Sequence, residues 1–268
     1  MTSNSDRSAA VASRVSFWLR HPALATMLLA LTLLVAALAW PLLVSRPQNG
    51  GAAAQHHELP WQIEPQPQGG SRVFGLEPGR TSLREARERW GDDLQIAILT
   101  ARGEAGALEA AVDNFRAGFV TGKLILSFET QPATLAQWRE RALKREVIEG
   151  STTLRERLHP DDLTAALPLP LVGLTFIPSV HLDADTVRQR FGEPAGRHAL
   201  GAQQHWLYPE RGLAVTLDPQ GRELLQYVAP REFEARLMRP LLRAAAAAEE
   251  AASAAAAAAA SEAAAASR

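Results

Sequence analysis

The sequence predicts an α+β protein: an N-terminal transmembrane helix, then a domain of two tandem helix-plus-antiparallel-sheet units, then an alanine-rich tail. Three observations predict this architecture. A long uncharged apolar run lies near the N-terminus, two later stretches share one order of strand, capped helix and glycine stop, and the last residues are almost pure alanine. With 268 residues, 47% of them hydrophobic, the chain has material for one or two domains.

The pattern of the N-terminal residues predicts a membrane anchor. Residues 22–44 are apolar, uncharged and without a polar face, and about the length needed to cross a bilayer core. Three arginines lie in residues 1–21 and only Arg46 follows the run closely, so the positive-inside rule places the leader in the cytoplasm. Ala37–Ala39 resembles a signal-peptide cleavage site, but the long apolar run and long polar leader favour an uncleaved signal anchor.

Residues 45–71 are rich in Pro, Gly, Gln and Ala, which predicts a linker. The apolar island Leu59–Ile63 within it is able to pack on the domain as a leading strand. The first α+β unit is assigned to residues 72–158. Its helix begins at a capping box formed by Ser82 and Glu85 and buries Leu83, Ala86 and Trp90.

The rest of the first unit alternates strand and helix patterns. Leu94 to Ile98 and Lys123 to Phe128 alternate as strands, whereas residues 105–116 fit either a helix or a strand-and-loop insertion. We expect a connecting helix over Ala133–Arg145 and an extended segment over Val147–Leu158.

The second α+β unit, residues 159–242, holds the clearest folding pattern. The apolar run Leu174–Ile177 precedes a helix with Asp183 as its N-cap and Gly192 as its C-cap. A meander then follows, with strands predicted around Trp206–Tyr208, Leu213–Leu217 and Glu223–Val228. Residues 73–91 align without a gap on residues 174–192, which indicates a tandem duplication.

The chain ends in a basic amphipathic segment, Pro230–Leu242, and a low-complexity tail, residues 243–268. Alanine favours helix, but no apolar stripe marks a face for a partner. We therefore expect the tail to be frayed or disordered.

The segments Val187–Pro194 and Trp206–Tyr208 together resemble the small outer-membrane assembly lipoprotein domain of the SmpA/BamE type. Residues 79–91 keep a degraded version of the same pattern. This resemblance implies a helix packed on an antiparallel sheet, a layout shared with the tandem repeats of the β-lactamase inhibitor protein. The chain has no lipobox cysteine, so a role in outer-membrane assembly does not carry over. As a whole, the chain also resembles uncharacterised membrane-anchored proteins of proteobacteria.

Composition and motifs point away from several function classes. The formal net charge of −1, without a basic stripe, disfavours nucleic acid as a partner, and the absence of cysteine removes disulfides and thiolate metal sites. His159, Asp161 and Asp162 form the best cluster for a metal or an acid–base pair, but a helix start explains the same residues. The linker pair His56–His57 would bind metal only weakly. We therefore expect no cofactor, no metal site and no catalytic residues.

Trp206 and Tyr208 allow two interpretations: core aromatics, or a protein-binding face of the sheet. The sequence thus favours a single-pass bacterial inner-membrane protein with a periplasmic, non-enzymatic domain that binds an envelope protein. The alternatives are an envelope hydrolase or metal-dependent enzyme using His159, Asp161 and Asp162, or a sensor of a small ligand.

Overall fold

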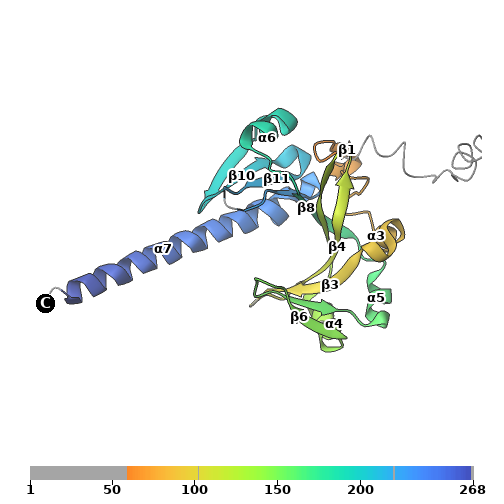
Figure 1. Ribbon diagram of the computed structural model, residues 1–268, viewed down its shortest axis with the longest axis horizontal. Helices are drawn as coiled ribbons and strands as arrows, with labels where there is room; N and C mark the ends of the chain where they lie inside the picture. The colour runs from red at the N-terminus through yellow and green to blue at the C-terminus, as the bar shows by residue number, and fades with distance from the viewer. Residues whose placement is uncertain (1–58, 102, 220, 267–268) are drawn as a thin grey trace, which may run out of the picture. The chain divides into compact units, whose positions relative to one another are not determined.

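A computed structural model describes residues 59–266 except 102 and 220, and it has an α+β fold built on a large antiparallel sheet (Figure 1). The predicted leader, the predicted span at residues 22–44 and the pair His56–His57 lie outside the described residues. Among the helices of the described part, none is long and apolar enough to cross a bilayer.

The main sheet has ten strands in the order β6-β7-β3-β4-β5-β8-β12-β11-β10-β9, all neighbours antiparallel. Its strands are β3 (Gln95–Thr100), β4 (Ala107–Ala117), β5 (Val120–Phe128), β6 (Lys144–Val147), β7 (Leu154–Arg157), β8 (Leu171–Pro178), β9 (Gly196–Leu200), β10 (Gln203–Tyr208), β11 (Leu213–Leu217) and β12 (Leu224–Tyr227). A separate hairpin joins β1 (Glu64–Gln66) to β2 (Gly70–Arg72) around the 3₁₀ turn Pro67–Gly69.

Among the described residues, five α-helices accompany the sheet: α3 (Leu83–Trp90), α4 (Pro132–Glu140), α5 (Pro160–Ala166), α6 (Ala184–Phe191) and α7 (Arg239–Ala266). Short 3₁₀ turns lie at Gly91–Asp93, Pro209–Arg211 and Pro230–Glu232, and a π-helical turn at Glu234–Met238 leads into α7.

Helices α3, α4, α5 and α6 enclose the main core against one face of the sheet. The strand register aligns Leu124, Phe176 and Leu225 across the centre of that face. The ring of Phe74 packs 5.4 Å from that of Phe176, measured between centroids. Strand β8 therefore joins the two ends of the sheet through one continuous core.

The predicted caps of α3 and α6 are confirmed. Ser82 and Glu85 form a reciprocal capping box at α3, and Asp183 accepts a hydrogen bond from the Thr186 N–H at α6. Each helix ends at a glycine with positive φ, Gly91 at 53° and Gly192 at 77°. These glycines adopt backbone angles that other residues reach only with strain, so each helix stops where the sequence indicates.

Several other segments differ from the sequence-based expectation. The island Leu59–Ile63, in the segment 45–71 assigned to a linker, packs on the domain as expected, and the Tyr227 hydroxyl donates a hydrogen bond of 2.9 Å to the Pro60 carbonyl. It is not a strand, however, and the residues after it form the hairpin of β1 and β2. Of the two alternatives for residues 105–116, the structure has a strand, β4, which begins at Ala107. The connecting helix ends at Glu140 rather than Arg145, because Lys144–Val147 pairs with β7 as the edge strand β6.

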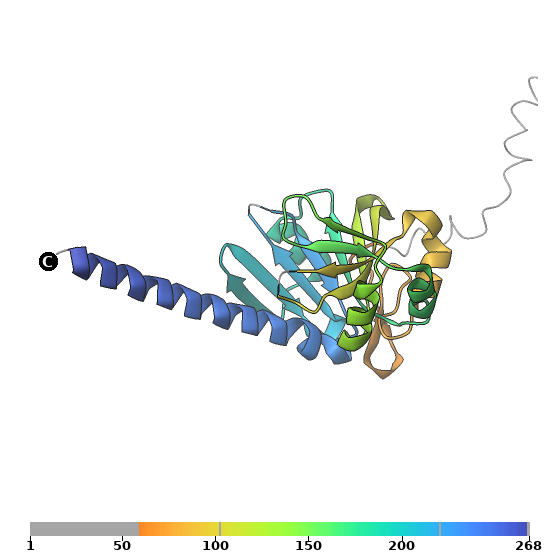
Figure 2. The ribbon, with the colours of Figure 1, turned by 90° about the horizontal axis from the view of Figure 1, so that it is seen from below.

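The alanine-rich tail forms helix α7, which corrects the expectation of a frayed or disordered segment (Figure 2). Two causes act together. Alanine has the highest helix propensity, and the start of the helix is anchored by tertiary contacts. Leu237, Met238 and Leu241 pack on a second small core on the other face of the sheet, which consists of Leu207, Ala214, Val228 and Phe233.

Candidate functional site

The residues that carry the family resemblance meet in one structural module. The Tyr208 hydroxyl donates a hydrogen bond of 3.0 Å to the Gly192 carbonyl, and its ring lies 6.0 Å from that of Phe191. The hydrogen bond and the ring contact connect strand β10 to the C-terminus of α6. Trp206 and Tyr208 are only 2% and 5% exposed, so of the two interpretations the burial supports core aromatics rather than a contact face.

This burial makes a prediction for alkaline solution. Desolvation raises the pKa of Tyr208 to about 12, and the pKa of Tyr227 well above its usual value. Both tyrosines are neutral in the fold, so their contribution to stability is complete below about pH 10, the pKa of an unfolded tyrosine. It is lost as the pH rises towards 12.

The chain has two tyrosines, so an ultraviolet titration of tyrosinate measures this directly. The folded protein is expected to show almost no tyrosinate at pH values where the urea-unfolded chain is already half ionised. A folded chain that ionises at the unfolded midpoint would contradict the placement of both rings. The Tyr208→Phe variant assigns the first ionisation to Tyr208.

The cluster of His159, Asp161 and Asp162 does not converge on one site. His159 is the N-cap of α5, where its Nδ1 accepts a hydrogen bond of 3.3 Å from the Asp161 N–H. The Asp161 side chain is exposed, whereas Asp162 is buried and forms an ion pair with Arg141. Within residues 59–266, apart from 102 and 220, no three His, Asp or Glu side chains are grouped to hold a metal ion.

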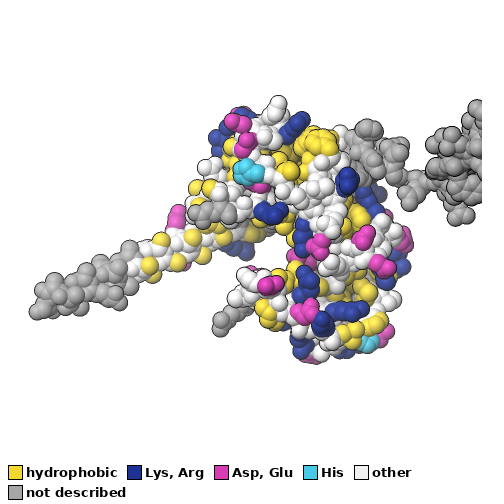
Figure 3. Space-filling model, in the orientation of Figure 1, with side chains coloured by type: hydrophobic (Ala, Val, Ile, Leu, Met, Phe, Trp, Pro, Cys, Tyr) yellow, Lys and Arg dark blue, Asp and Glu magenta, His cyan; other side chains and the backbone are white. Residues whose placement is uncertain are grey.

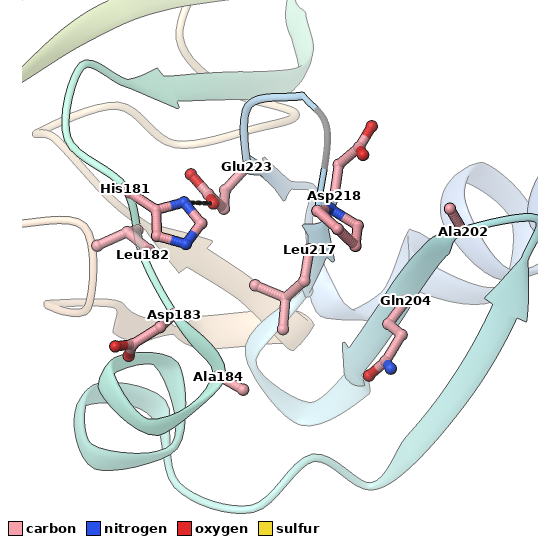
Figure 4. Close-up of a pocket in the computed structure, with 10 residues that line it drawn as sticks. His181, Leu182, Asp183, Ala184, Ala202, Gln204, Leu217, Asp218 and Glu223 are labelled. Atoms are coloured by element: carbon pink, nitrogen blue, oxygen red, sulfur yellow. Dashed lines mark ion pairs between the residues drawn. The ribbon is translucent and has the colours of Figure 1, made fainter.

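A cavity of about 230 Å³ lies between the start of α6 and the ends of β10, β11 and β12. The buried carboxylate of Glu223 forms an ion pair there with His181 (Figure 4). Asp183 and Asp218 also line the cavity, but their carboxylates point away from one another. Asp183 is occupied as a helix cap and Asp218 accepts a hydrogen bond from Gln203. The cavity thus contains one buried carboxylate, paired with an imidazole.

His198 and His205 lie opposite each other on β9 and β10. The Nδ1 of His205 is 3.0 Å from the Thr216 hydroxyl. Burial lowers the pKa of His205, and the neighbouring His198 adds to that effect. Both imidazoles lie on the sheet face opposite α3–α6.

A second candidate surface is the part of the sheet face opposite helices α3–α6 that Phe233, Leu237, Met238 and Leu241 leave uncovered, and we call this part the open face. One row of directly paired residues crosses it: Ala111, Ile125, Thr175 and Gln226. All four side chains are half-buried, neutral and small to medium in size. Figure 3 shows the molecular surface hollowed between α7 and the part of the domain that contains β6.

Charged residues lie beside this row on the open face, among them Arg155, which pairs with Glu146 in the strand register. Lys123 forms an ion pair of 2.8 Å with Asp113. Burial raises the pKa of Glu109, and Lys123 opposes that rise. Desolvation disfavours the charged form of a carboxyl group, which is why burial of Glu109 has this effect.

The strand alternation could identify these residues as facing away from the core. Their alignment into one row depends on the pairing of β8 with β5 and β12, which no local pattern in the sequence specifies.

Comparison with known proteins found no match: no family model, no curated protein and no solved structure matches the chain.

Proposed function

We propose that this protein is a single-pass bacterial inner-membrane protein whose periplasmic domain binds an envelope protein and carries out no catalysis. The apolar run at residues 22–44 and the arginines that precede it support the anchor and its orientation. The open face of the sheet is the proposed binding surface, and its row of half-buried neutral side chains is the observation that carries the proposal.

The open face has the character of an interface core. Interface centres are depleted in charge and close-packed, with polar groups at their rim. The row from Ala111 to Gln226 provides such a centre, and Asp113, Lys123 and Glu109 lie beside it. A hollowed surface also buries more area against a convex partner than a flat one does.

A membrane anchor favours binding to a partner that is located at the same membrane. A span tethered to the domain confines it to the membrane region and raises its effective concentration near any partner that is also there. The proposed role therefore does not require a high intrinsic affinity.

We also propose that residues 72–158 and 159–242 are tandem units of SmpA/BamE-like layout. Helices α3 and α6 have equivalent caps at aligned positions, which supports this origin. The two units differ in the segment before the helix. In the second unit this segment is strand β8, whereas the first unit has only an isolated bridge between Val73 and Leu76.

The binding surface is tested by crosslinking and affinity capture from native membranes. The tagged full-length protein is compared with Thr175→Arg, which places a long cation in the centre of the row. Gln189→Arg, on the exposed side of α6, adds the same charge to the opposite layer. An arginine in the centre of an interface removes binding energy, whereas a change outside the interface does not. We therefore expect Thr175→Arg to reduce capture of the partner at least ~10-fold. Gln189→Arg should leave capture unchanged.

Circular dichroism and urea unfolding serve as the control that both variants are folded before capture is compared. Equal capture by wild type and by both variants would rule out the open face as the binding surface. Complete absence of a specific partner would contradict the interaction role itself and direct attention to the cavity at Glu223.

A further inference from the structure

Three apolar side chains from separate chain segments meet at one end of the sheet. Phe119 is 73% exposed at the β4–β5 turn, and Val180 is 52% exposed in the loop after β8. The Trp61 ring lies 5.9 Å from that of Phe119, between centroids. The Ser179 N–H donates a hydrogen bond of 2.8 Å to the Thr121 carbonyl, which holds Val180 beside the same turn. We call Trp61, Phe119 and Val180 the end patch.

The fold does not require phenylalanine at position 119. Ala117 pairs with Val120, so Gly118 and Phe119 alone form the turn. Gly118 has a φ of 61° and Phe119 does not have a positive φ, which is the pattern of a turn that needs glycine only at its first central position. The second position accepts polar residues, which would avoid exposing a ring to water. The exposed ring therefore has no explanation in the turn itself.

The end patch lies where the described chain begins, because Trp61 is two residues after Leu59. Residues 45–58 separate it from the predicted span. A flexible segment of that length has a root-mean-square reach of about 20 Å, and a fully extended one reaches about 50 Å. If residues 22–44 cross the membrane as proposed, a connection of that length limits the distance of this end of the domain from the bilayer.

The chemistry of the end patch fits a lipid surface. Tryptophan and other aromatic rings favour the membrane–water interface, and arginine is attracted to anionic headgroups. The guanidinium carbon of Arg190 lies 4.6 Å from the centroid of the Trp61 ring, so a cation accompanies the aromatic pair.

We propose that the end patch rests on the periplasmic surface of the inner membrane, with Phe119 inserted at the headgroup level. This inference rests on the membrane anchor of the proposed function. It leaves the open face available for a protein partner, because the row from Ala111 to Gln226 crosses the sheet on strands β4, β5, β8 and β12, away from the turn that carries Phe119.

The test uses full-length protein in nanodiscs of phosphatidylethanolamine and phosphatidylglycerol. The chain has no cysteine, so single substitutions to cysteine carry a nitroxide label without background. Phe119→Cys is compared with Val147→Cys, a position 64% exposed on β6. The readout is collisional relaxation by oxygen, which concentrates in lipid, and by a nickel chelate, which stays in water.

We expect the label at position 119 to show a several-fold higher oxygen-to-nickel ratio than the label at position 147. Equal ratios at the two positions would overturn the proposal. Low accessibility to both reagents at position 119 would overturn it too, because that result indicates contact with protein rather than lipid.

Leu33→Cys separates this inference from the anchor on which it rests. A lipid-exposed label at position 33 with a water-exposed label at position 119 refutes the end patch and leaves the anchor intact. A water-exposed label at position 33 refutes the anchor itself.

Discussion

Replacing Phe176 with alanine is expected to reduce the free energy of unfolding by about 3–5 kcal/mol, the usual cost of deleting a buried aromatic ring. Phe176 is fully buried on β8, between Leu124 and Leu225 in the strand register. Its ring also packs on Phe74 and Phe115. The cavity left by alanine lies where the two ends of the sheet join, so neighbouring elements are unable to close it without disturbing the strand pairing.

Urea unfolding measures this effect, and Phe119→Ala is the matched control. Both substitutions delete the same ring, but Phe119 is exposed, so its removal should change the free energy of unfolding by no more than about 0.5 kcal/mol. Similar losses for the two variants would contradict the placement of β8 at the centre of one core.

The second large effect is expected at the buried carboxylate of Glu156. Arg139 and Arg145 contact it through their Nε atoms at 2.5 and 2.9 Å, and the Thr100 hydroxyl lies 3.2 Å away. The double variant Arg139→Met/Arg145→Met keeps most of the apolar side-chain volume but removes both cations. Because it leaves a buried carboxylate with the Thr100 hydroxyl but without a neutralising cation, we expect a loss of about 3–5 kcal/mol.

Adding Glu156→Gln to that double variant should recover a large part of the loss, since a neutral amide is less costly to bury than an unpaired carboxylate. Chemical denaturation of the three proteins at neutral pH measures the recovery. The exposed pair of Asp185 and Arg188 is the comparison, and Asp185→Ala should cost less than about 0.5 kcal/mol. If the triple variant were no more stable than the double variant, the uncompensated charge would not be the cause.

Local signals in the sequence were sufficient for part of this fold. The caps at Ser82, Asp183 and Gly192 and the strand Leu213–Leu217 follow from side-chain hydrogen bonding, backbone freedom and alternation, and all four are confirmed. These features are determined within a few residues of chain, which is why sequence patterns reveal them.

Other features depend on contacts distant in the sequence. Strand β9, Gly196–Leu200, has little apolar alternation and was missed, because its pairing with β10 rather than its own residues defines it. The tail helix depends on its anchor at Leu237 and Met238. The ion pair of His181 with Glu223 and the row on the open face likewise arise only once β8 lies between β5 and β12.

Trp206 and Tyr208 show why aromatic residues on a strand do not by themselves reveal which face of the sheet is exposed. Aromatic residues on a strand are suited equally to a core and to an interface, and the choice depends on which face the helices cover. Here α6 covers the face that carries both rings. The surface left available is lined by less conspicuous residues, Ile125 and Thr175 among them.

The most direct test of the central claim is site-specific photocrosslinking in native membranes. A thiol-linked benzophenone is attached to Thr175→Cys on the open face or to Gln189→Cys on α6, in a chain that has no other cysteine. We expect a discrete protein adduct from position 175 and none from position 189. Adducts of the same partner at both positions, or none at position 175, would contradict the open face as the protein-binding surface.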